Sequence, residues 1–324
     1  MLTFDKALDL IPEGTKYSIL LANGFSQAWN ADIFNYANLL GAAKFENRDV
    51  ELKSLFNDAK TYDFEIIMKQ LESAELVLKA YGSNKKILKQ IESDKTTLKN
   101  ALIEAISSTH PERPSDITNE QYETVRTFLC QFNKIFTLNY DLLFYWARNK
   151  DNLKPENYNT DDGFRTEKLW KGRETNQNVY FLHGGLHIYD TYTDIKKHTY
   201  TQNSEPIVDQ VRVNLNNGEF PLFVSEPTHE KKKSRIEHNP YLSYCYRELK
   251  DLNEVLFIYG HSMNDNDRHI FNGIKLSGIS KIFVSIFGDE NSESNARLKE
   301  NAMSYLKNNN TVEFYQAESA RVWA

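Results

Sequence analysis

Six short apolar runs in this chain each end in a polar residue or a glycine. The runs are rich in Val, Ile, Leu, Phe and Tyr without apolar–polar alternation, which is typical of strands buried on both faces of a parallel sheet. They cover residues 18–24, 134–141, 179–185, 221–227, 255–262 and 281–289. We therefore predict an α/β fold in which these runs form one mainly parallel sheet with helices on both faces.

The segment between the first and second runs has a different pattern. In 64–82 and 91–106, apolar residues recur with the period of a helix. We predict a helical insertion or subdomain over residues 31–129. This insertion would interrupt an α/β domain built from residues 1–30 and 130–324.

The rest of the chain alternates loops with further elements. Residues 150–178 and 186–220 are predicted to be loop-rich, with a hairpin near 188–194. Residues 238–252 are predicted to be helical, with Pro240 at the first helical position. A last strand is expected over 311–315.

Composition narrows the class of protein. The net charge of −6 gives no field that favours DNA or RNA. The apolar runs are too short to span a bilayer, and the first residues lack the basic start and apolar centre of a signal peptide. We therefore expect a cytoplasmic protein without direct membrane or nucleic-acid contacts. Its two cysteines, Cys130 and Cys245, are expected to be unrelated thiols.

Polar side chains stand where the apolar runs end. In open α/β sheets, ligands bind just beyond the carboxyl ends of the strands. The candidate positions are Asn23, Asn139, His183, Ser225, His261 and Asp289. The sequence thus predicts that these side chains surround a nucleotide-like ligand. The basic run 230–235 is interpreted as a solvated loop, with a phosphate or substrate contact as the alternative.

Four strand-end stretches, taken in order, resemble the signature stretches of SIR2-like proteins, which bind NAD on a Rossmann-type sheet. They are residues 23–26, 137–141, 183–185 and 260–265. The layout, including residues 63–65 and 239–249, also resembles the bacterial SIR2-like group known as DUF4917. The resemblance implies a Rossmann-like fold and NAD+ as the substrate.

The chain also departs from the sirtuin pattern. Two cysteines cannot build the four-cysteine zinc ribbon of sirtuin deacetylases. The opening glycine-rich stretch has lost one glycine and reads Ala22-Asn23-Gly24-Phe25-Ser26. These differences disfavour a protein deacetylase and are similar to the SIR2-like effectors of bacterial antiphage defence, which hydrolyse NAD.

The resemblance gives Asn139, Asp141 and His183 catalytic roles. Asn139 is expected to orient a water molecule beside the anomeric carbon, with helix capping as the alternative. Asp141 would hold a ribose hydroxyl or orient Asn139, or else cap a helix. His183 would accept a proton as a neutral imidazole, the alternative being a buried histidine before a turn.

Further residues are predicted to bind the substrate. The amides of Gly24, Phe25 and Ser26, at a helix start that Ser26 would cap, are expected to hold the diphosphate. Asn23 would bind the ligand or support the turn, and Phe25 would cover the nicotinamide or fill the core. Gly184 would let the backbone approach the ligand. The adenosine side is assigned to Gly260, His261, Ser262 and, through the ribose hydroxyls, Asp289.

No metal is predicted, because the spacing of the other histidines matches no ligand motif. They are His187, His198, His229, His238 and His269.

Three functions are compatible with these residues. The first is an NAD+ hydrolase that acts in antiphage defence by abortive infection. The second is ADP-ribosyl transfer or deacylation in the same pocket, and the third is a non-catalytic NAD- or ADP-ribose-binding subunit of a defence complex. Because an unrestrained hydrolase would kill its host, we expect control by homo-oligomerisation or by a sensor protein encoded nearby, such as a nucleotide-binding or nucleic-acid-sensing subunit.

Overall fold

The main sheet has six parallel strands. The computed structural model describes residues 1–34, 39–82, 84–156, 158–191, 193–198, 206–226, 228–308 and 310–324. The strands are β1 (Tyr17–Leu21), β2 (Ile135–Thr137), β3 (Val179–Phe181), β7 (Asn253–Tyr259), β8 (Gly278–Ile286) and β9 (Thr311–Gln316). They are ordered β3-β2-β1-β7-β8-β9, and every neighbouring pair is parallel. The predicted α/β, Rossmann-like fold is confirmed.

Burial explains the unbroken apolar runs. Ile19, Leu20 and Leu21 in β1 are fully buried, and so are Phe257 and Phe283 in β7 and β8. These side chains point alternately to the two faces of the sheet, so both faces are covered.

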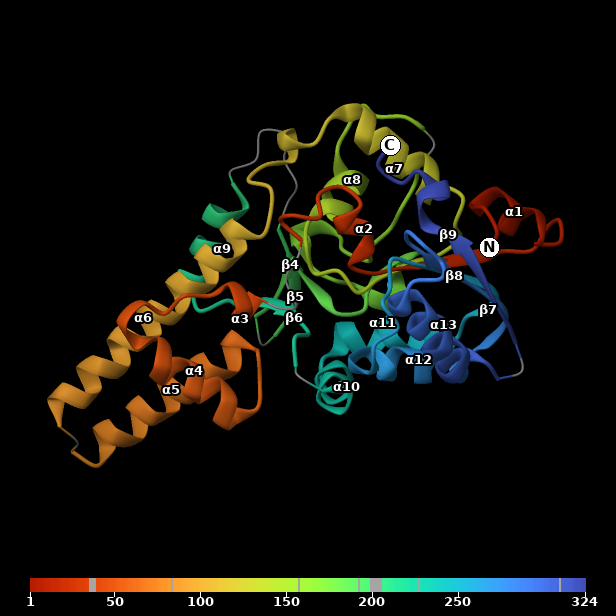
Figure 1. Cartoon of the computed structure of the whole chain (residues 1–324). Coiled ribbons are helices and arrows are strands. Elements are labelled where there is room, and N and C mark those ends of the chain that lie inside the picture. Colours follow the sequence, from red (N-terminus) through yellow and green to blue (C-terminus); the bar gives the residue numbers. More distant parts are fainter. Residues whose placement is uncertain are drawn as a thin grey trace.

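Helices cover the sheet in two layers (Figure 1). One layer includes α7 (Asn119–Leu129) and α8 (Leu143–Asn149), which contact each other. The other includes α10 (His229–His238), α11 (Pro240–Lys250), α12 (Arg268–Lys275) and α13 (Glu293–Leu306). Asn239 caps α11, and Pro240 occupies its first position as predicted. The N-terminal helix α1 (Phe4–Asp9) contacts β9.

The run 221–227 is not in the main sheet, so that part of the prediction is wrong. Its strand β6 (Pro221–Phe223) pairs with β4 (Gly184–Asp190) in a separate antiparallel sheet of order β5-β4-β6. The run ends at Pro227, which lies outside the described residues. A short apolar stretch fits either sheet equally well, so the sequence could not choose between them. The predicted hairpin near 188–194 is formed by β4 and β5 (Ile195–Lys197).

A helical arm extends from the α/β body, at the lower left of Figure 1. It contains α3 (Leu39–Ala42), α4 (Asp49–Ala59), α5 (Phe64–Ala80), α6 (Lys85–Ser108) and, from later in the chain, α9 (Ile207–Asn216). Helix α6 contacts α3, α5 and α9, whereas α7 packs on α8 in the body. The division at residues 31–129 remains a proposal.

Shorter elements complete the chain. Helix α2 (Gly24–Gln27) follows β1, and 3-10 turns occupy Glu46–Arg48, Pro114–Asp116, Thr166–Lys168, Gly172–Glu174, Asp265–Asp267 and Ala317–Ala320. The basic run 230–235 is not a loop but part of α10, because the Thr228 side chain caps the helix by accepting a hydrogen bond from the Lys231 amide.

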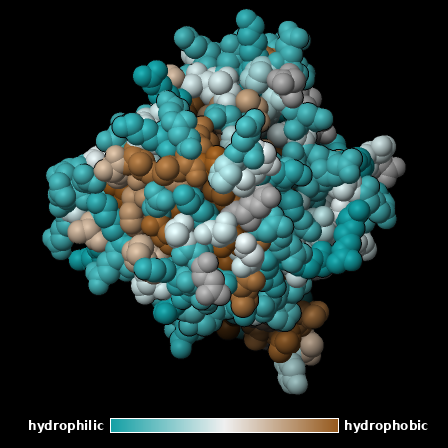
Figure 2. All heavy atoms as spheres, turned by 90° about the vertical axis from the view of Figure 1, so that its right-hand side faces the viewer, coloured by the Kyte–Doolittle hydropathy of each residue, from teal (hydrophilic) through white to brown (hydrophobic). Residues whose placement is uncertain are grey.

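The remaining features of the fold concern its surface and its two cysteines. Among the described residues, no helix combines the length and apolar composition that a bilayer span requires. The face shown in Figure 2 is mostly hydrophilic and includes a hydrophobic area. Cys130 is exposed, Cys245 is buried, and both are free thiols.

Candidate active site

A cavity of about 500 Å³ opens at the carboxyl ends of the central strands. Strands β1 and β7 are neighbours, but the chain proceeds from β1 toward β2 on one side and from β7 toward β8 on the other. Such a switch point leaves a crevice where open α/β sheets bind their ligands. The residues around it are Ala22, Asn23, Gln27, Tyr62, Leu138, Asn139, Tyr140, Asp141, His183, Val224, Ser225, Glu226, Lys232, Gly260, His261, Ser262, Asn264, Asn266 and Asp267.

Two glycines bring the turns after β1 and β7 into contact. The Gly24 amide donates a 2.8 Å hydrogen bond to the Gly260 carbonyl. A Cβ on Gly24 would lie 2.5 Å from the Gly260 Cα, and Gly260 has a φ of +70°. The floor of the cavity therefore depends on both residues lacking a side chain.

Gly260→Ala is expected to destabilise the fold by about 2–5 kcal/mol, from the left-handed backbone and the clash together. Its Cβ would lie 2.6–2.8 Å from backbone atoms of Gly24 and Phe25. Urea unfolding measures the effect. Gly218→Ala is the matched control, because Gly218 has a φ of +79° but no atom within 4 Å of an added Cβ. Equal losses in both variants would contradict the packing argument.

Ser26 and Asp141 fix the orientation of Asn139. Asn139 Nδ2 donates to Ser26 Oγ at 2.8 Å, and Ser26 Oγ donates to Asp141 Oδ2 at 2.5 Å. The Leu143 amide donates to Asp141 Oδ1, at the start of α8. Because Nδ2 of Asn139 is engaged, its Oδ1 is the atom that can accept a hydrogen bond in the cavity. Burial raises the pKa of Asp141 to about 6, while its bonds to Ser26 and Leu143 oppose that rise.

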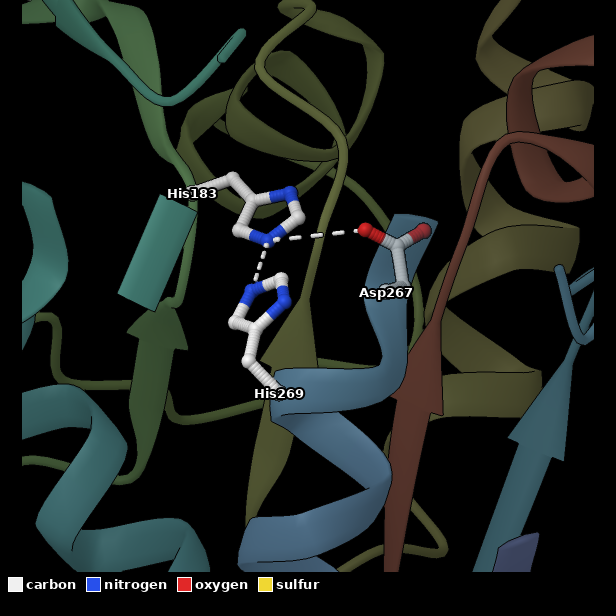
Figure 3. A group of neighbouring side chains, drawn as sticks. All are labelled: His183, Asp267 and His269. Carbon is white, nitrogen blue, oxygen red and sulfur yellow. Dashed lines mark hydrogen bonds and ion pairs between the residues drawn. The ribbon is translucent and has the colours of Figure 1, made fainter. Parts of the chain in front are cut away.

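His183, just after β3, meets a cluster from the start of α12 (Figure 3). Its Nε2 lies 3.1 Å from His269 Nε2 and 4.0 Å from Asp267 Oδ1. Asp267 also pairs with Lys232 Nζ at 2.7 Å and with His261 Nε2 at 3.2 Å. Burial, together with the charge of Lys232, lowers the pKa of His183 to about 3, so the ring is neutral at pH 7. Burial raises the pKa of Asp267, but the hydrogen bond from His261 and the basic groups around it, including the Lys232 ammonium, outweigh burial and hold that pKa well below its ordinary value.

A second polar wall follows β6. Ser225 Oγ and Glu226 Oε2 are buried without a hydrogen-bond partner, and both residues line the cavity. Burial and the charge of Asp63 raise the pKa of Glu226 to about 7. The sequence identified Ser225 only as the polar end of a strand and gave Glu226 no role. The unpaired carboxyl became visible only when the tertiary structure showed what surrounds it.

The predicted site residues divide into two groups. Eight line the cavity: Asn23, Asn139, Asp141, His183, Ser225, Gly260, His261 and Ser262. The others, Gly24, Phe25, Ser26, Gly184 and Asp289, are not among its lining residues.

The amides expected to hold a diphosphate are engaged elsewhere. Those of Gly24, Phe25 and Ser26 donate to the carbonyls of Gly260, Ala22 and Asn23. Helix α2 is a single turn, and Ser26 lies buried within it instead of capping it. This arrangement contradicts the predicted role of the turn as an anion cradle.

The structure also places Phe25, Gly184 and Asp289 outside the cavity lining. Phe25 fills the core against Phe144 and Trp323, which settles its two alternatives in favour of packing. Gly184 lies in β4, where a Cβ would meet the Leu222 carbonyl oxygen at 2.0 Å. The side chain of Asp289 is exposed and accepts a hydrogen bond from the Asn291 amide.

The sheet order and the polar crevice define an α/β protein with a candidate ligand site at the carboxyl ends of its strands. Residues 19–323 match the family described as "Domain of unknown function (DUF4917)", and the chain belongs to this family. No curated protein matches the chain. Among solved structures, a mutant Sir2 homologue in complex with 2'-O-acetyl ADP-ribose is similar over 93% of this chain and 96% of its own, with 14% identity and a TM-score of 0.34.

Proposed function

We propose that this protein is a SIR2-like NAD+ hydrolase, which cleaves the nicotinamide–ribose bond to give nicotinamide and ADP-ribose. The observation that carries the proposal is the meeting of Asn139, Asp141 and His183 on one cavity at the crevice between β1 and β7. These residues come from the ends of two different strands, and they are of the types that the reaction needs.

The reaction makes modest chemical demands. The ring nitrogen of nicotinamide is cationic in NAD+, so the C–N bond breaks with its electron pair going to nicotinamide and no acid is needed. Water then adds to the anomeric carbon and loses one proton. The enzyme has to orient that water and stabilise an oxocarbenium-like state.

Asn139 and His183 fit these tasks. The Ser26–Asp141 pair fixes the amide of Asn139, so its Oδ1 is a preorganised acceptor for a water hydrogen. The neutral imidazole of His183 can accept a hydrogen bond from water or a ribose hydroxyl. Its Nε2 shares a proton with His269, which ties the tautomers of the two rings together.

Binding of the dinucleotide needs groups other than the α2 amides. Among the described residues around the cavity, Lys232 is the one lysine or arginine. It lies in the basic run 230–235, for which a phosphate contact was the alternative prediction. We assign it to the diphosphate side, where its positive charge would attract the phosphates although the chain as a whole is acidic.

The biological role that we propose is antiphage defence by abortive infection in the cytoplasm. Depletion of NAD+ stops the growth of an infected cell, and the same activity would kill an uninfected one. We therefore infer that a regulatory partner encoded nearby, or self-association, holds the enzyme quiet until infection.

Product analysis tests the proposal. The purified chain, alone and with the proteins encoded beside it, is incubated with NAD+, and nicotinamide and ADP-ribose are measured by chromatography. Equal amounts of both products are expected, with the faster rate in the presence of the partner. Consumption only when an acyl-lysine peptide is added would indicate deacylation. NAD+ binding without turnover under all conditions would indicate a binding subunit.

A further inference from the structure

Figure 3 shows an imidazole nitrogen of His183 facing one of His269, with a carboxylate oxygen of Asp267 turned toward the same His183 nitrogen. His183 comes from the end of β3, and Asp267 and His269 from the start of α12. Their Nε2, Oδ1 and Nε2 atoms all lie within 4.8 Å of one another. His183 and His269 are buried, and His183 and Asp267 line the cavity.

We propose that His183, His269 and Asp267 bind a first-row divalent transition-metal ion, with Zn²⁺ the ion that best matches them. Two imidazoles and one carboxylate are a common protein ligand set for Zn²⁺, which leaves a fourth position open. Nitrogen and oxygen donors, with no thiolate among them, also argue against copper(I).

The distances suit such an ion. Bonds of about 2.0–2.1 Å in a tetrahedron place ligand atoms about 3.3 Å apart. The two Nε2 atoms are already 3.1 Å apart, and Asp267 Oδ1 is 4.0 Å from His183 Nε2. The three ligand atoms lie up to 4.8 Å apart, so the Asp267 carboxylate has to move toward the two rings to complete the set.

The charges also suit a cation. The carboxylate of Asp267 supplies a negative charge, and each neutral imidazole can supply the lone pair of one ring nitrogen. The second oxygen of Asp267 is bonded to His261 Nε2, which orients the carboxylate as outer partners of metal ligands do.

Lys232 is the competitor for this site. Its ammonium lies 2.7 Å from Asp267 Oδ1, the oxygen that an ion would take. A divalent ion therefore has to displace an ion pair, and its affinity is reduced by that competition. Removal of the ammonium should tighten metal binding, a result that a non-specific surface site would not give.

The sequence did not predict this site. Metal binding was excluded on the spacing of the histidines other than His183, and that argument did not consider His183 and His269 together. They are 86 residues apart and meet only because β3 and α12 are neighbours in the fold.

Zn²⁺ binding to the chelator-treated full chain tests the proposal by calorimetry, and Co²⁺ absorption reports the coordination. One ion per chain is expected. His269→Ala and Asp267→Asn should each weaken binding by at least about 100-fold, because even outer-shell losses cost 10–100-fold. Lys232→Met should strengthen binding by at least about 10-fold.

His238→Ala is the matched control, because His238 is exposed on α10 and should not affect binding. Circular dichroism confirms that each variant is folded. If His269→Ala does not fold, Asp267→Asn carries the test because it preserves shape. No stoichiometric binding by the wild type, or undiminished binding by a folded His269→Ala or Asp267→Asn protein, would overturn the proposal. The readout is metal binding, so the result does not depend on NAD+ turnover. A ligated His183 has no free lone pair to accept a proton, so the metal-bound form is expected to be slower in the proposed hydrolysis than the metal-free form.

Discussion

Asn139→Ala is expected to slow NAD+ hydrolysis by about 10²-fold or more, the scale of a lost orienting group. The alanine has no oxygen to position the attacking water. The fold should persist, because the change removes one hydrogen bond to Ser26 and costs about 1 kcal/mol of unfolding free energy. Turnover is measured from nicotinamide release by the activated enzyme, with thermal unfolding in parallel.

Asn216→Ala provides the comparison for this variant. Asn216 is exposed at the end of α9 and does not line the cavity, so the same chemical change should leave turnover unaltered. Unchanged nicotinamide release by a folded Asn139→Ala protein would remove Asn139 from the mechanism.

His183→Ala is expected to reduce turnover by about 10²–10⁴-fold if the imidazole accepts the proton from water or ribose. His183→Gln should fail to restore the rate, since an amide can accept a hydrogen bond but not a proton. Both proteins should retain NAD+ binding, measured by calorimetry, and both should relieve toxicity in cells that express the active complex.

The exposed His238 again supplies the matched substitution, and His238→Ala should retain full activity. The base assignment fails if His183→Ala loses NAD+ binding and turnover in equal proportion, which would indicate a role in binding alone. Full activity of the isolated wild-type chain would remove only the inference of a regulatory partner.

The fold was largely predictable because burial on both faces leaves a local signal. Residues 19–21 of β1 and 255–258 of β7 are apolar at every position, and this pattern does not occur in half-exposed strands. The sequence carries no comparable signal for which strands pair with each other. The strand β6 was therefore assigned to the main sheet instead of the antiparallel sheet. The basic run in α10 was taken for a loop because its charges hid a helix that begins at the cap Thr228.

Site residues could be predicted from the sequence only where a polar side chain directly follows an apolar strand. That rule identified Asn139 and His183, which do line the cavity. It did not identify His269 and Lys232, whose contacts join elements far apart in the sequence. The α2 amides were assigned to phosphate binding because a turn after a strand has free donors in isolation, whereas here the neighbouring turn of β7 uses one of them.

Helix α10 connects the arm to the catalytic wall. On one side, Lys231 Nζ donates to the Lys60 carbonyl, and Arg235 lies 3.7 Å from Asp63. On the other side, Lys232 holds Asp267, the neighbour of His183. Because these basic side chains belong to one helix, a displacement of α10 by the arm would be expected to disturb the ion pair between Lys232 and Asp267. A protein that binds the helical arm could thus change the surroundings of His183 without entering the cavity.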